Sequence, residues 1–173
     1  MINKVGNFEK VSYKQFKKDM ESVFENKYTD ADIKKIYDGI RLPERATKGS
    51  AGHDFFTPVD IEISTGETIQ IPTGIRVRMD EGWWLGCFPK SGLGFKYRLQ
   101  LDNTCGIVDS DFYFSDNEGD IQAKITVDAK TDKTLSLSAG NKFMQAVFIP
   151  YGITYNDNAS GVRNGGLGST SLK

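Results

Sequence analysis

The chain has 173 residues, which is enough for one domain with a sizeable hydrophobic core and too few for two ordinary domains. Its 22 basic and 23 acidic residues give a formal net charge of −1, which excludes an overall positive field that would hold a nucleic-acid polymer. We therefore expect any bound anion to be small and held locally.

The cysteines and the start of the chain indicate the cellular compartment in which the protein is expected. Cys87 and Cys105 lie in apolar surroundings without the spacing of metal ligands, so we expect no disulfide scaffold of the kind found in small secreted proteins. The opening MINKVGNFEK has no apolar core of a signal peptide, and no stretch approaches the roughly 18 apolar residues of a membrane span. These features predict a cytoplasmic protein without a membrane partner.

Residues 1–41 are predicted to form a helical extension. Apolar side chains recur with a helical period from Ser12 to about Tyr37, and Pro43 ends the pattern. Thr29 followed by Asp32 resembles a capping box at the start of the second helix. The two apolar stripes comprise Tyr13, Phe16, Met20, Val23 and Phe24, and then Ile33, Ile36, Tyr37 and Ile40. These two stripes predict two short amphipathic helices, which need a surface to pack against.

Residues 42–155 are predicted to form a mainly β domain. After Thr57 apolar residues alternate with polar ones in several short runs, and the turn sequences STGE, PTG, DEG and SAGN separate those runs. Short strands at this spacing are typical of an antiparallel β barrel or sandwich. Residues 156–173 contain few apolar residues, so we expect a flexible arm unless it docks on something.

The segment GIVDSDFYFSDNEGD carries five acidic residues, although like charges at short range repel each other. A solvated loop is the default interpretation of such a run. The alternative is that one carboxylate acts on a substrate or on a metal-bound phosphate. These residues are Asp109, Asp111, Asp116, Glu118 and Asp120.

Two glycine-rich stretches have the composition of phosphate-binding loops. PKSGLGFK places Lys90 and Ser91 beside two glycines, which allow backbone N–H groups to approach an anion closely. RNGGLGSTS, which starts at Arg163, combines an arginine with hydroxyl donors and could close over a polyphosphate. Either stretch alone is more often an ordinary turn or a disordered tail.

Two further stretches contain polar residues next to buried-looking strands. In ATKGSAGHDFFTP, Asp54 could satisfy backbone donors of a turn, and His53 has no orienting partner that would make it a base. In GNKFMQAVFIP, Gln145 either caps neighbouring backbone or reaches a ligand. The sequence alone does not distinguish between these alternatives.

Five stretches in this order resemble the motifs of the trimeric dUTP pyrophosphatases (dUTPases), in particular the longer bacterial and phage members. GSAGHDFF is similar to the first motif, PKSGLG to the second, NTCGIVDSDF to the third, GNKFMQ to the fourth and RNGGLGSTS to the fifth. The resemblance spans residues 42–171. It implies a jelly-roll-like β barrel in a homotrimer, with each active site shared among three subunits.

The resemblance also implies the reaction. A dUTPase hydrolyses dUTP to dUMP and pyrophosphate, which limits uracil in DNA and supplies the dTMP precursor. Asp109 matches the aspartate that activates water as general base, and Asp111 would support it. We expect Asp116, Glu118 and Asp120 to lie in a solvated extension. Mg²⁺ is expected on the triphosphate and waters, without a direct protein ligand.

The substrate-binding residues follow from the same matches. Asn103 and the backbone around Gly106 and Ile107 would read uracil, and Phe112 would stack under the deoxyribose. Lys90, Ser91 and Gly92 would hold phosphates, with Gln145 near the α-phosphate. Arg163, Leu167, Gly168, Ser169 and Thr170 belong to the arm that reaches the γ-phosphate end, while Asp54 and Lys142 are supporting residues.

This sequence departs from the dUTPase pattern at five positions. Lys90 and Lys142 replace arginines and lose the bidentate fork, and His53 and Phe112 replace tyrosines. Leu167 replaces the phenylalanine that covers the base. These departures motivate an alternative, a nucleotide-binding or regulatory protein that does not hydrolyse dUTP. A dCTP deaminase of related fold is a third hypothesis.

Overall fold

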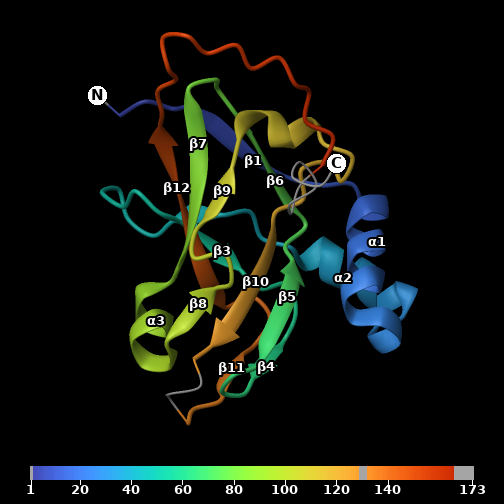
Figure 1. The fold of residues 1–173 in the computed structure, drawn as a ribbon. Helices are drawn as coiled ribbons and strands as arrows, with labels where there is room; N and C mark the ends of the chain where they lie inside the picture. The colour runs from blue at the N-terminus through green and yellow to red at the C-terminus, as the bar shows by residue number, and fades with distance from the viewer. Residues whose placement is uncertain (1, 129–131, 166–173) are drawn as a thin grey trace.

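The computed structural model describes residues 2–128 and 132–165 and confirms a mainly β chain with helices near its N-terminus (Figure 1). The helical elements are α1 (Tyr13–Phe24), the single turn η1 (Glu25–Lys27), α2 (Asp30–Gly39), α3 (Ser91–Tyr97) and the turn η2 (Ser110–Phe114). The strands are β1 (Gly6–Lys10), β2 (Glu44–Arg45), β3 (His53–Phe56), β4 (Ile61–Ile63), β5 (Thr68–Pro72), β6 (Ile75–Met79), β7 (Trp83–Pro89), β8 (Leu99–Leu101), β9 (Gly106–Val108), β10 (Gln122–Val127), β11 (Leu135–Leu137) and β12 (Lys142–Pro150).

The largest sheet of the described residues has the strand order β2-β3-β12-β7-β9, and each neighbouring pair is antiparallel. A second sheet has the order β5-β10-β8, and β11 pairs with β4. In the centre of the largest sheet, β7 and β12 pair over seven residues, from Met144 opposite Pro89 to Pro150 opposite Trp83. This long central pair holds the shorter strands in place.

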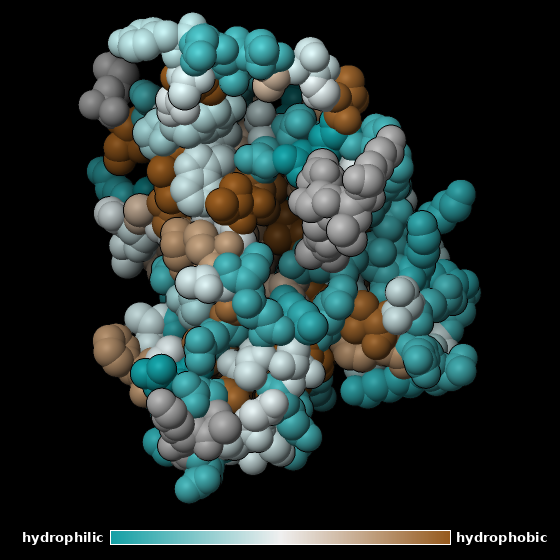
Figure 2. Space-filling view, viewed as in Figure 1, coloured by the Kyte–Doolittle hydropathy of each residue, from teal (hydrophilic) through white to brown (hydrophobic). Residues whose placement is uncertain are grey.

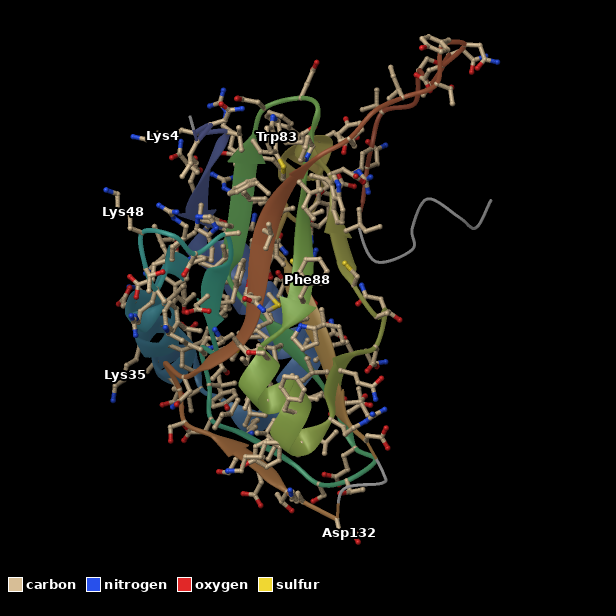
Figure 3. The ribbon with its side chains drawn as sticks, turned by 90° about the vertical axis from the view of Figure 1, so that its left-hand side faces the viewer. Lys4, Lys35, Lys48, Trp83, Phe88 and Asp132 are labelled. Atoms are coloured by element: carbon tan, nitrogen blue, oxygen red, sulfur yellow. The ribbon has the colours of Figure 1, made fainter. Side chains whose placement is uncertain are left out.

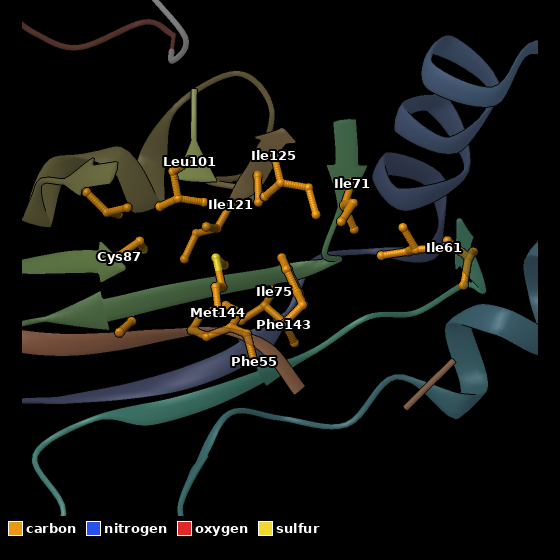
Figure 4. Close-up of a cluster of buried hydrophobic side chains, with 14 of the residues drawn as sticks. Phe55, Ile61, Ile71, Ile75, Cys87, Leu101, Ile121, Ile125, Phe143 and Met144 are labelled. Carbon is orange, nitrogen blue, oxygen red and sulfur yellow. The ribbon is translucent and has the colours of Figure 1, made fainter. Parts of the chain in front are cut away.

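The inward side chains of these strands form one hydrophobic core, because alternate residues of a strand point to the same face. Ile71, Leu85 and Ile125 are fully buried, and Figure 4 shows side chains of β5, β6, β7, β8, β10 and β12 meeting in this core. The two-residue alternation predicted from the sequence is therefore confirmed as the alternation between core and surface.

The two predicted helices are confirmed, and they pack on the β region. Thr29 and Asp32 form the predicted capping box, with reciprocal side-chain and backbone hydrogen bonds. Gly74, at φ +68°, leaves room for the extension: a Cβ there would lie 2.5 Å from Ile40 Cδ1 and 2.9 Å from Phe16 Cδ2. Glycine at this turn therefore lets both helices approach the strands.

The sequence analysis did not predict strand β1 in the N-terminal extension. β1 pairs with β6 from Gly6 opposite Met79 to Lys10 opposite Ile75. Its short sequence, GNFEK, lacks a clear alternation, and its partner lies about seventy positions away. The extension is thus joined to the β region by backbone pairing as well as by helix packing.

The prediction of a loop at PKSGLGFK was wrong, because Ser91–Tyr97 form helix α3. Arg98 ends this helix in the left-handed conformation, at φ +51°, and its N–H donates to the carbonyls of Gly94 and Leu93. The two glycines suggested a turn, but neither has a positive φ in the structure.

Both cysteines are free thiols, which agrees with the expectation of no disulfide scaffold. No helix among the described residues has the length and apolar character that crossing a membrane requires.

Candidate active site

A pocket of about 540 Å³ opens between β8, β9, η2 and β10. Five of the predicted substrate-binding residues line it, namely Asn103, Gly106, Ile107, Phe112 and Arg163. Its lining includes the apolar Leu101, Val108 and Ile121 as well as polar residues. Figure 2 shows apolar residues, in brown, at the surface in the upper half of the face seen there. The pocket therefore combines apolar walls with a few polar groups, as small-molecule sites commonly do.

The turn between β8 and β9 shapes one wall of this pocket. Gly106 pairs with Cys87 of β7, and a Cβ on Gly106 would lie only 3.0 Å from the Cys87 Cβ. The backbone at Gly106 is close to β7 because it has no side chain. Burial raises the pKa of the Cys87 thiol to about 12, so it lines the pocket as a neutral group.

Asp109 and Asp111 lie where β9 ends and η2 begins. The Arg163 guanidinium forms an ion pair with Asp109, and its Nε donates to Asp111 Oδ1 at 2.8 Å. Only 24% of the Arg163 side chain is exposed, although most of the neighbouring arm residues are exposed. The structure thus brings together the candidate base, its supporting carboxylate and the arginine of the arm.

A second cluster of predicted residues surrounds Asp54 of β3. Lys90 Nζ lies 2.6 Å from Asp54 Oδ1, and Lys142 Nζ lies 2.7 Å from Asp54 Oδ2. Burial of this carboxylate opposes its ionisation, but hydrogen bonds from Lys142 and Lys90 outweigh burial and hold its pKa below the usual value. Two ammonium groups against one carboxylate leave the cluster with one net positive charge.

Gln145 of β12 connects this cluster to the start of α3. Its Nε2 donates to the Pro89 carbonyl at 3.3 Å, directly before Lys90. Gly52 makes room for the amide, since a Cβ at Gly52 would lie 2.7 Å from Gln145 Oε1. Ser91 and Gly92 follow as exposed residues in the first turn of α3.

Strand β7 carries the contacts of both clusters. Cys87 pairs with Gly106 of the pocket, and the next residue, Phe88, pairs with Gln145. Figure 3 follows β7 from Trp83 at one end to Phe88, close to where α3 begins. Two neighbouring residues of one strand therefore pair with the pocket wall on one side and with the strand of Gln145 on the other.

His53 has the surroundings of a packing residue. Its ring lies 5.3 Å from that of Phe8 and 5.5 Å from that of Phe148, between centroids. Burial lowers the pKa of His53, which favours a neutral ring. None of the described hydrogen bonds joins His53 to an acidic residue around η2.

The expectation of a solvated extension from Asp116 to Asp120 was wrong for Asp120. Asp116 is exposed and Glu118 is half-buried, but Asp120 is only 1% exposed and is one of the residues that line the pocket. The remaining predicted site residues, Leu167, Gly168, Ser169 and Thr170, lie outside the described residues.

No three histidine, cysteine, aspartate or glutamate side chains within residues 2–128 and 132–165 gather in a metal-binding arrangement. Both oxygens of Asp54 already bind ammonium groups, which leaves this carboxylate poorly suited to ligate a cation directly. A divalent cation carried by phosphate oxygens and waters is compatible with such a site, because Mg²⁺ retains several waters in proteins.

The sequence analysis missed two contributors to this geometry. Gly52 was quoted within a motif but not singled out, and Cys87 was treated only as a cysteine in apolar surroundings. A glycine directly before a strand could have suggested close packing, although its partner Gln145 is distant in sequence. The place of Cys87 in the pocket depends on pairing between β7 and β9.

Comparison with known proteins gives a consistent result. The dUTPase family model matches residues 38–171. A deoxyuridine 5'-triphosphate nucleotidohydrolase of Lactococcus lactis is 33% identical over 135 residues, which cover 76% of this chain and 89% of that protein. One from Shewanella baltica is 37% identical over 114 residues, covering 63% of this chain and 69% of that protein.

Solved structures show the same similarity. The dUTPase of Streptococcus mutans has a TM-score of 0.62 and 32% identity, and the alignment covers 86% of this chain and 98% of that one. A dUTPase from a phage of S. aureus has a TM-score of 0.57 and 21% identity, with 70% and 90% covered, and this likeness concerns the fold.

Proposed function

The chain belongs to the dUTPase family and is a dUTP nucleotidohydrolase, and from this premise we propose how its residues convert dUTP and water to dUMP and pyrophosphate. One observation carries the proposal: Asp109 stands beside a pocket lined by Asn103, Gly106 and Phe112. The pocket would take the base and sugar, and the carboxylate would face the triphosphate.

In this mechanism Asp109 is the general base. It removes a proton from a water molecule, whose oxygen attacks the α-phosphorus while the bond to the bridging oxygen of pyrophosphate breaks. Within one chain Arg163 forms ion pairs with both Asp109 and Asp111, and in the proposed trimer it would leave them for the γ-phosphate of a dUTP bound at a site formed with a neighbour. Its departure would free the Asp109 carboxylate to act as the base.

The base and the sugar would be recognised in the pocket. Asn103 and the backbone around Gly106 and Ile107 would pair with the edge of uracil, and Phe112 would stack under the deoxyribose. Phe112 is 9% exposed and lines the pocket, so its ring is held by its neighbours before the nucleotide binds.

The cluster at Asp54 would hold the phosphates. Lys90 and Lys142 are kept in place by one carboxylate and retain one positive charge in excess. Ser91, Gly92 and the Gln145 amide would add donors toward the α-phosphate region. A lysine here offers charge without the bidentate geometry of arginine, so Asp54 supplies the orientation that lysines lack.

We further propose a homotrimer in which three chains share each site. Several large apolar side chains are exposed and would be covered in an assembly. They are Phe95, Ile107, Phe114, Tyr151, Ile153, Tyr155 and Val162. The arm that contains Arg163, Leu167, Gly168, Ser169 and Thr170 would then close a site formed with a neighbour.

Mg²⁺ fits the site as a companion of the nucleotide, because the carboxylates of Asp54, Asp109 and Asp111 are already paired with lysine or arginine. When bound, it would offset charge on the phosphate oxygens. The protein's own residues would orient the triphosphate and move the proton at Asp109. The cytoplasm is the proposed location, since the deoxynucleotide pool is there.

The test is to incubate the purified protein with dUTP, dCTP or dTTP and Mg²⁺ and to measure pyrophosphate and ammonia. We expect pyrophosphate from dUTP and little from the other two. Nucleotide binding without pyrophosphate would instead indicate a regulatory protein, and ammonia from dCTP would indicate a deaminase. Neither alternative is favoured by the family and its named relatives.

A further inference from the structure

The segment that carries Phe112 is attached to the N-terminal extension at three points. Tyr113 Oη donates to Glu9 Oε2 of β1 at 2.8 Å. Glu118 accepts hydrogen bonds from the backbone N–H and the hydroxyl of Ser12, both at 2.7 Å, where α1 begins. The third point is inside the protein, where the Asp19 side chain of α1 acts on Asp120.

Asp19 and Asp120 are both buried, with 8% and 1% of their surface exposed. Gln15 Nε2 donates to Asp19 Oδ2 at 2.8 Å. No donor group makes a well-formed hydrogen bond to either oxygen of Asp120 within the described residues, so its interactions are the contact with the Asp19 carboxyl and the weaker influence of the backbone N–H groups of Gly74 and Ile75. Two ionised carboxylates have acceptors only, so this contact requires a proton between them.

We propose that the N-terminal extension is a positioning element for the nucleotide pocket, and that Asp19 and Asp120 attach it through a shared proton. This inference rests on the proposed function, since it assigns a role to the wall of the same pocket. Asp19 lies outside residues 38–171, which the family model matches, so the role concerns a part of the chain beyond that match.

The pocket wall can transmit a movement at Asp120 to Phe112. Asp120 lines the pocket itself, and Gly119 before it is at φ +75°. A Cβ on Gly119 would lie 2.8 Å from the Phe112 carbonyl oxygen, and Ser115 Oγ donates to that oxygen at 2.6 Å. The segment from Phe112 to Asp120 therefore closes tightly on itself, so a shift of Asp120 would be passed on to Phe112.

Several groups face this pair. Gln15 comes from α1, Gly74 and Ile75 offer backbone N–H groups from β6 and the turn before it, and Asp19 is the charged side chain that acts on Asp120. Lys14 and Arg76 act on Glu118, two residues away, whose pKa falls because the hydrogen bonds from Ser12 outweigh burial.

The pH dependence follows from the direction of the pKa of Asp120. Burial, and then the charge and hydrogen bond of Asp19, raise this pKa well above its usual value. For a carboxyl whose folded pKa is raised, the stabilising effect is complete below the unfolded pKa and is lost as pH rises through the folded pKa. The attachment therefore weakens in the alkaline direction.

The experiment compares the wild type with Asp19→Asn and Glu21→Gln from about pH 6 to about pH 9. An asparagine amide donates to Asp120 without a titrating proton, so it replaces the shared proton permanently. Glu21 is an exposed carboxylate on the same helix and serves as the matched control. KM and kcat for dUTP and the midpoint of thermal unfolding without nucleotide are measured at each pH.

In the wild type and in Glu21→Gln, we expect KM to rise with increasing pH as Asp120 ionises, by at least about threefold between the acid and alkaline ends of the series. In Asp19→Asn the rise in KM should be less than half of the wild-type rise, with kcat little changed. The decrease of the unfolding midpoint with pH should become smaller in the same way. An Asp19→Asn variant that keeps the wild-type pH profiles of KM and midpoint overturns the inference. The unfolding measurement needs no turnover, so it decides the attachment even if dUTP is not hydrolysed.

Discussion

Lys142 Nζ lies 2.7 Å from Oδ2 of Asp54, a carboxylate whose side chain is only 4% exposed and whose other oxygen binds a second lysine. The two ammonium groups are thus oriented by a single buried anion. Orientation of this kind matters because a lysine ammonium is a compact charge on a flexible stem.

Replacing Asp54 with asparagine tests that orientation. An amide can accept at only one oxygen, so one lysine should lose its partner, and we expect KM for dUTP to rise about tenfold. The free energy of unfolding should fall by about 2 kcal/mol, the range for a hydrogen bond to a charged group. Steady-state kinetics and urea denaturation measure the two effects, with Glu62→Gln on the exposed side of β4 as control. Unchanged kinetics would remove Asp54 from a supporting role.

The same carboxylate predicts a loss of stability in acid. Its folded pKa is lowered from the ordinary value of 3.8, so its contribution to stability is present above that value and is lost as pH falls through the folded pKa. In urea titrations at decreasing pH, wild type and Asp54→Asn should differ above about pH 4 and converge below it. Parallel curves down to the lowest pH would contradict this expectation.

Asp109→Asn tests the general base. An amide cannot take the proton from water, so kcat should fall by about two to four orders of magnitude. The affinity for a non-hydrolysable dUTP analogue should change little, because the pocket walls are untouched. Single-turnover assays and calorimetry measure these quantities. Asp111→Asn should have a smaller effect on kcat, and equal losses in both variants would leave the base unassigned.

Gly52→Ala tests how Gln145 is placed. The added methyl would lie 2.7 Å from Gln145 Oε1 and should force the amide away from the Pro89 carbonyl. We expect kcat/KM to fall about tenfold, which corresponds to about 1.4 kcal/mol. Gly49→Ala, in the same loop, has no atom within 4 Å of the added carbon and should retain full activity. Equal activities of the two variants would show that the amide adjusts freely.

Thr29→Ala removes the capping side chain of α2. The hydroxyl accepts from the Asp32 N–H at 3.2 Å, and loss of such a cap typically costs about 1 kcal/mol. Thermal unfolding should show a midpoint lower by a few degrees, while kcat and KM for dUTP should stay at wild-type values. A change in KM would show that α2 also supports the pocket.

Local patterns were sufficient to predict much of the fold. The capping box needed only Thr29 and Asp32, and the alternation of Ile75, Val77 and Met79 predicted a strand with one buried face. Strand β1 was missed because its place is set by pairing with β6. Helix α3 was missed because two glycines favour a turn, whereas the left-handed end at Arg98 and the adjoining strands fix a helix.

The candidate site was predictable where its residues belong to one motif. Gly106 begins β9 and Asp109 directly follows that strand, so their proximity follows from sequence order. Asp120 was misjudged because its burial is set by tertiary packing, and Asp19, the carboxyl that acts on it, lies about one hundred positions earlier in the chain. A charge run alone gives no sign of such a distant carboxyl partner.

The adjacency of Cys87 and Phe88 on β7 has a consequence for the proposed trimer. In that trimer, the pocket that binds the base and the Asp54 cluster that holds the phosphates would belong, within one chain, to two different active sites. A single stretch of backbone, paired on both sides, would then run from one centre into the next. The three centres would be linked through covalent polypeptide as well as through subunit boundaries, so strain introduced at one would travel along a stiff strand to its neighbour.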